Sequence, residues 1–67
     1  MSTPDDSPRL LRLPEVQRRT GLSRSTIYKL MAAGEFPRSV RLAYKLALWY
    51  APEIDTWILD VAARRAA

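Results

Sequence analysis

The chain has no cysteine and no histidine among its 67 residues, and it has only two glycines. Without cysteine there is no disulfide, thiol nucleophile or zinc–thiolate site, and without histidine the commonest general base and nitrogen ligand are missing. Gly21 and Gly34 lie far apart, so no glycine-rich phosphate loop is present. We therefore expect a protein that is not an enzyme and that uses neither a metal nor a cofactor.

Long apolar runs are also missing, since no stretch approaches the roughly 18 apolar residues that a membrane helix needs. Residues 1–8, MSTPDDSP, are polar and lack the apolar segment of a secretory signal peptide. Their composition predicts a disordered tail. We expect no membrane partner, a cytoplasmic location, and a single domain over residues 9–67, because so short a chain has room for one core.

Charge is unevenly distributed along the chain. Basic residues outnumber acidic residues by 11 to 7, which gives a net charge of +4 and a pI near 10.1. Between Arg18 and Lys45, Glu35 is the only acidic residue, and it stands among seven basic ones: Arg18, Arg19, Arg24, Lys29, Arg38, Arg41 and Lys45. A basic middle flanked by acidic ends favours a surface that faces a polyanion, although a solvated charged face has the same composition.

Start and stop signals predict two short helices in the first half of the chain. Pro14 suits the first position of a helix that runs to Thr20 and ends at Gly21, and Ser23 suits the N-cap of a helix that ends near Gly34. One stripe of the second helix is apolar and is expected to face the core: Leu22, Ile27, Leu30 and Met31. Two helices joined by so short a turn are typical of a helix-turn-helix, but also of bundles that bind no nucleic acid.

The other side of the second helix is polar and predicts contacts with DNA. A helix fits the major groove, and its N-terminal residues reach the base edges, which here are Ser23, Arg24, Ser25 and Thr26, followed by Tyr28 and Lys29. Arg24 suits either a guanine edge or a phosphate, and Tyr28 suits either a phosphate or half-buried packing. The remaining cations are predicted to neutralise phosphates: Arg18, Arg19, Arg38, Arg41 and Lys45.

The segment from residue 36 to residue 50 allows two interpretations. Val40–Leu42 and Leu46–Tyr50 fit two strands of a hairpin that turns around residues 43–45, yet the turn has none of the Gly, Asn or Asp that hairpins favour. The segment is rich in Leu, Ala and Lys at helical spacing, so its local propensity favours a helix. A last helix is predicted from Pro52 onward, with Trp57 as the expected core anchor.

One motif is specific to a known family. The residues LPEV, four further residues, GLSRSTIY and then FPR closely resemble the AlpA-type phage regulatory proteins, which are related to MerR-like domains and to phage excisionases. The resemblance extends through Trp49 and residues 53–58. It implies a MerR-like winged helix-turn-helix, mainly α-helical with a small β-hairpin, in which Ser23–Ala33 is the recognition helix and Val40–Trp49 the wing. It also implies sequence-specific binding of double-stranded DNA, as a transcription regulator or as an excisionase that works with an integrase or recombinase.

The chain departs from this family at the wing. The family usually has Gly at the position of Ala43, and small or charged residues where this chain has Tyr44, Leu46, Leu48 and Tyr50. These apolar side chains support an alternative function, a protein-interaction module that uses residues 44–50 while its basic charge is incidental. For the DNA-binding function, a module this small covers only roughly 600–1,000 Å² of DNA, so we expect cooperative self-association along a site.

Overall fold

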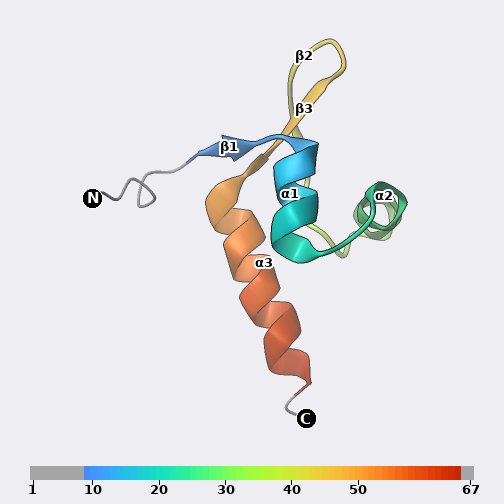
Figure 1. Ribbon diagram of the computed structural model, residues 1–67. Coiled ribbons are helices and arrows are strands. Elements are labelled where there is room, and N and C mark those ends of the chain that lie inside the picture. The colour runs from blue at the N-terminus through green and yellow to red at the C-terminus, as the bar shows by residue number, and fades with distance from the viewer. Residues whose placement is uncertain (1–8, 66–67) are drawn as a thin grey trace, which may run out of the picture.

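The computed structural model describes residues 9–65, so the predicted tail 1–8 lies outside the described residues. The elements follow one another as β1 (Leu10–Leu11), α1 (Leu13–Thr20), α2 (Arg24–Ala32), β2 (Val40–Ala43), β3 (Leu46–Tyr50) and α3 (Ala51–Arg64). The strands form an antiparallel sheet in the order β1-β3-β2. Figure 1 shows the β2–β3 hairpin projecting away from the helices, while α3 extends in the opposite direction. The predicted winged helix-turn-helix, mainly α-helical with a small hairpin, is confirmed.

Local signals set the two helices of the helix-turn-helix. Helix α1 begins at Leu13, one residue before the predicted start, and ends where Gly21 adopts a left-handed φ of 76°. The Gly21 N–H donates to the carbonyl of Gln17 at 2.7 Å, which closes the last turn. Because a side chain at such a φ is strained, this glycine allows the chain to turn sharply into α2. Both predicted helices are confirmed.

The segment after α2 forms a hairpin, so the helical interpretation of residues 36–50 is wrong. Its register is given by three pairs, with a bulge between Arg41 and Ala43: Val40–Leu48, Arg41–Ala47 and Ala43–Leu46. Lys45 takes a φ of 60° in the turn, where hairpins usually place Gly or Asn. Helix propensity is overridden because β3 also pairs with β1, which brings Leu11 opposite Trp49.

Trp49 lies at the centre of the core. It is fully buried with one side chain from each of four other elements: Leu11, Val16, Ile27 and Ile54. The prediction that Trp57 anchors the core is therefore wrong. Trp57 is half-buried at the edge, where its Nε1 donates to the carbonyl of Glu35 at 2.9 Å and its ring packs against Phe36.

The core contacts of α3 come from its first eight residues, Ala51 to Ile58. Ala51 and Ile54 are buried and Ile58 packs against them, whereas Leu59 is 70% exposed. The Ala51 N–H also donates to the carbonyl of Arg9 at 2.8 Å, which ties the start of the helix to the strand β1 region. Among the described residues, no helix has the length and apolarity to cross a lipid bilayer.

Two alanine substitutions on α3 test this packing. Ile54→Ala is expected to lower the free energy of unfolding by about 2–5 kcal/mol, because it removes a fully buried side chain and leaves a cavity. Leu59→Ala on the same helix is the matched control and is expected to change it by less than about 0.5 kcal/mol. Urea denaturation followed by circular dichroism measures both, and equal losses in the two variants would contradict the core described here.

Candidate nucleic-acid interface

Helix α2 buries one face and exposes four of the predicted DNA-binding side chains on the other. Ile27 is fully buried and Leu30 and Met31 pack around it. The exposed side chains are Arg24, Ser25, Tyr28 and Lys29. They form two pairs at i, i+4 spacing, so they share one side of the helix.

Tyr28 packs partly against the core and stays partly exposed, so its position is compatible with both predicted roles, half-buried packing and contact with a phosphate. Its ring meets the ring of Trp49 edge to face, with 6.3 Å between the ring centroids, while 39% of the residue stays exposed. The guanidinium of Arg24 lies 5.5 Å from the centroid of the same ring. Tyr28 therefore connects the exposed cation of α2 to the tryptophan at the centre of the core.

The predicted N-cap Ser23 is confirmed. Its Oγ accepts the N–H of Thr26 at 3.2 Å and donates to Oγ1 of Thr26 at 2.9 Å. These bonds satisfy a free N–H at the start of the helix and hold the first turn in place. Both hydroxyls are thus engaged within the protein, and their contact with DNA stays a prediction.

A basic hollow of about 190 Å³ lies where the start of α1, the N-terminal half of α2 and the hairpin meet. Three cationic side chains line it, and they come from different parts of the chain: Arg12, Arg24 and Lys45. Tyr28 and Trp49 complete the wall with small and apolar residues, and no carboxylate is among the lining residues. Charges that converge without a carboxylate among them attract an anion.

Arg12 is the residue of this hollow that sequence reasoning missed. It precedes α1 as its N-cap, with an extended backbone. In the sequence it is one more residue of the lead-in before Pro14, with no motif to single it out. Only the packing of α1 against β3, the second strand of the hairpin, brings Arg12 beside Arg24 and Lys45.

Two of the cations predicted to contact phosphates form ion pairs with carboxylates of the same chain. Arg18 and Arg19 both pair with Glu15, and Arg19 also reaches Oδ1 of Asp55 on α3 at 3.2 Å. These pairs compensate both charges and connect α1 to α3. Phosphate contacts by Arg18 and Arg19 stay predictions, and such contacts would compete with these ion pairs.

Arg38 and Arg41 are exposed beyond the basic hollow. Arg38 follows α2 and borders a shallow depression beside Met31 and Ala32. Arg41 stands on β2 and is exposed like the rest of that strand. The structure thus places Arg38 near the C-terminal half of α2 and Arg41 on the wing, outside the hollow that Arg24 and Lys45 share.

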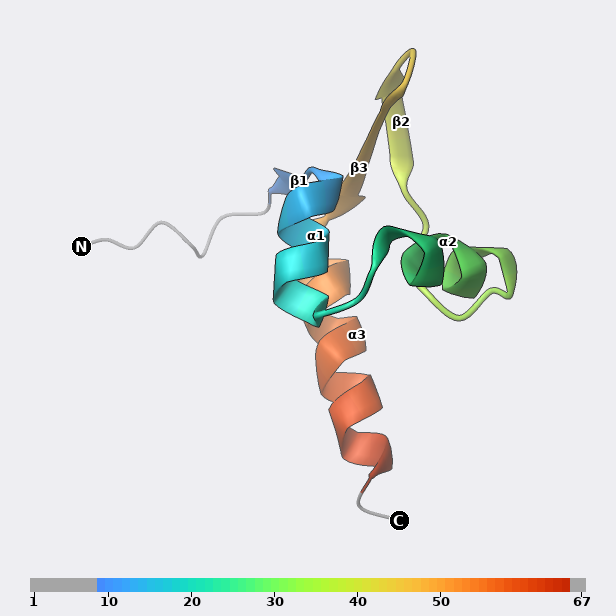
Figure 2. The same cartoon turned by 45° about the vertical axis from the view of Figure 1, so that its right-hand side comes forward.

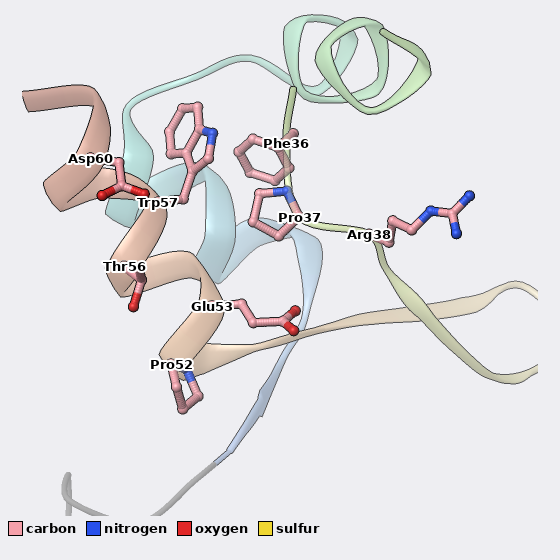
Figure 3. Close-up of a pocket in the computed structure, with 8 residues that line it drawn as sticks. All are labelled: Phe36, Pro37, Arg38, Pro52, Glu53, Thr56, Trp57 and Asp60. Atoms are coloured by element: carbon pink, nitrogen blue, oxygen red, sulfur yellow. The ribbon is translucent and has the colours of Figure 1, made fainter. Parts of the chain in front are cut away.

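A second, larger groove of about 580 Å³ runs between α3 and the segment that follows α2 (Figure 3). Phe36, Pro37 and Trp57 form apolar parts of its wall, and Glu53 and Asp60 add two carboxylates from α3. Figure 3 shows the guanidinium of Arg38 pointing away from this groove. Because carboxylates repel phosphates, this groove is unsuited to nucleic acid.

The predicted apolar docking surface over residues 44–50 does not form as a continuous patch. Leu48 is only 8% exposed and Leu46 is half-buried, whereas Tyr44 and Tyr50 are exposed. Leu46, Leu48 and Tyr50 stand two residues apart and therefore share one face of β3, but the rest of the molecule covers that face at Leu48. The prediction is therefore wrong for Leu48, and the exposed apolar surface of the wing lies at its tip.

Comparison with known proteins gives consistent matches. The profile of the family described as "Prophage CP4-57 regulatory protein (AlpA)" matches residues 9–61. The uncharacterized protein ORF88 of Enterobacteria phage P4 is 46% identical over 66 residues, which cover 97% of this chain and 75% of the relative. The DNA-binding transcriptional activator AlpA of Escherichia coli (strain K12) is 38% identical over 56 residues, covering 75% of this chain and 80% of the relative. No solved structure matches the chain.

The cap at the start of α2 is tested by two serine substitutions. Ser23→Ala is expected to lower the free energy of unfolding by about 1 kcal/mol, because it removes the acceptor of the Thr26 N–H. Ser25→Ala, two residues on and exposed, is the matched control and is expected to stay within about 0.5 kcal/mol of the wild type. Thermal unfolding measures the stability of both variants. A Ser23→Ala variant as stable as the wild type would show that the cap does not stabilise α2.

Proposed function

This chain belongs to the AlpA family of prophage regulatory proteins, and from this premise we propose that it is a phage regulator that binds specific sites on double-stranded DNA. The observation that carries the proposal is the basic hollow, in which Arg24 of α2, Lys45 of the wing and Arg12 converge. It joins the recognition helix to the wing, the two elements with which a winged helix-turn-helix meets DNA.

In the proposed complex α2 enters the major groove with its N-terminal end leading. A helix about 10–12 Å across fits that groove, where the pattern of donors and acceptors differs for every base pair. Arg24, Ser25 and Lys29 are exposed on the side that faces away from the core. Arg24 is held against Tyr28, and its guanidinium suits two parallel hydrogen bonds to a guanine or to a phosphate.

The basic hollow then seats the backbone of the strand that passes between α2 and the wing. Arg12 and Lys45 line it together with Arg24, so a phosphate there meets three cations. Each phosphate contact adds roughly 0.9 to the slope of log affinity against log salt concentration. Arg38 and Arg41 add more distant positive charge.

Transcription regulation is the role that we favour, since the relative in Escherichia coli is described as a DNA-binding transcriptional activator. An excisionase role beside an integrase, and a closer kinship with MerR-like domains, rest on the sequence resemblance alone. All of these roles require the same DNA surface. None of them requires enzymatic activity of this chain.

The proposed surface is tested with three substitutions that each remove one positive charge. Arg24→Ala is expected to weaken binding to the specific site by about 1–3 kcal/mol, because it removes the guanidinium proposed to bond a guanine or a phosphate at the start of α2. Lys45→Ala is expected to weaken binding to all sequences alike and to lower the salt slope by about 0.9. Arg65→Ala, which is exposed at the far end of α3, is the matched control and is expected to bind like the wild type.

Footprinting on the DNA that flanks the gene, followed by fluorescence anisotropy on the protected duplex at several salt concentrations, measures all three variants. An Arg24→Ala variant that keeps the full footprint would contradict the placement of the recognition helix. A loss of the same size in Arg65→Ala would show that net charge alone governs binding.

The number of copies on one site follows from the size of the domain. A single module covers roughly 600–1,000 Å² of DNA, less than most specific complexes use, so several copies are expected to bind cooperatively along one site. Sedimentation analysis of the protein with the protected duplex measures the stoichiometry. A one-to-one complex at saturation would rule out this cooperative assembly while leaving the DNA-binding proposal intact.

A further inference from the structure

The tip of the wing exposes apolar side chains that nothing in the fold requires. Tyr44 is 86% exposed and Leu42 is 64% exposed, and Figure 2 shows the β2–β3 hairpin carrying this tip away from the helices. Tyr44 lies in the turn itself, next to Lys45 with its left-handed backbone. Apolar side chains concentrated at a projecting tip are a mark of an interaction site rather than of core packing.

The tip is held in a defined position relative to α2. Strand β3 pairs with β2 on one edge and β1 on the other, and its last residues include the buried Leu48 and Trp49. Trp49 contacts Tyr28 of α2, and Lys45 lines the basic hollow together with Arg24. The strand that carries the tip is therefore fixed to α2 and to the basic hollow.

We propose that Leu42 and Tyr44 form a wedge that enters the minor groove and partly unstacks one base step. The inference rests on the proposed function, because it requires that α2 and the basic hollow bind duplex DNA. Proteins that bend DNA from the minor groove insert apolar side chains such as leucine between base pairs. Leucine has no donor or acceptor with which to read a base edge, so its contact with DNA is a steric one.

The charges around the tip support DNA as the occupant. Arg41 precedes Leu42, and Lys45 follows Tyr44, so the apolar pair is bracketed by cations in sequence. Nζ of Lys45 lies 5.4 Å from the centroid of the Tyr44 ring. On binding, this cation exchanges the ring for a phosphate, and the freed face of the tyrosine meets a base.

The wedge is tested on the duplex that footprinting defines, with a fluorescent adenine analogue placed at successive steps and dyes at both ends. The wild type is expected to raise the analogue's fluorescence at one step and to shorten the end-to-end distance, because unstacking kinks the duplex. The double variant Leu42→Ala, Tyr44→Ala is expected to lose both signals. Tyr44→Phe, which keeps the ring, is the matched control and is expected to retain them.

A second readout uses a mismatch at the affected step, which removes part of the cost of unstacking. The wild type is expected to bind the mismatched duplex at least about fivefold more tightly than the matched one. The double variant is expected to bind the two duplexes equally. Its circular dichroism is expected to match that of the wild type, since both replaced side chains are exposed.

Unchanged unstacking and bending in the double variant would overturn the wedge, as would a wild-type complex with no fluorescence increase at any step. A double variant that keeps normal DNA binding and bending but loses a protein partner would overturn it in favour of a protein contact. In each case Arg24→Ala decides separately whether the DNA-binding proposal stands, because Arg24 lies on α2 and not on the tip.

Discussion

The burial of Trp49 is the interaction on which the rest of the structure depends. Burial of its ring removes roughly 200 Å² from water, which stabilises the fold by about 5 kcal/mol. Its Nε1–H is buried without a hydrogen-bond partner among the described residues, which offsets about 1–3 kcal/mol of this gain. The remainder is still a large part of the roughly 3–5 kcal/mol that the core of so small a domain supplies. Trp49 also belongs to β3 of the wing, and its ring meets that of Tyr28 on α2. The side chain that stabilises the fold therefore also sets the position of the wing relative to α2.

The helices could be predicted from the sequence, because their determinants are local. Pro14, Gly21 and Ser23 each act within one turn of the backbone, and the structure uses them as expected. Local signals could not decide between a hairpin and a helix for residues 36–50. Its residues favour a helix, and the strand forms because residues near position 10 pair with residues near position 50, a contact that no local pattern encodes.

The same difference between local and long-range determinants explains why Trp49, and not the predicted Trp57, lies at the centre of the core. Helical periodicity correctly placed Trp57 on the inner face of α3, but it cannot say how deep a position lies. Depth depends on where the other elements converge, and they converge on Trp49. Arg12 escaped prediction for a related reason, since its role comes from the meeting of three elements. The polar face of α2 was predictable because it requires only the spacing of residues within one helix.

The uneven distribution of charge over the surface arises only when the chain folds. The sequence has a net charge of +4, but Arg18 and Arg19 are compensated by Glu15 and Asp55, and two further carboxylates line the groove beside α3. Ion pairs at such partly exposed positions add little stability. Their larger effect is on the electric field, because three cations outside these ion pairs, Arg12, Arg24 and Lys45, meet in the basic hollow. A polyanion that approaches the molecule is then drawn toward the side that carries α2 and the wing, the side that the proposed DNA complex uses.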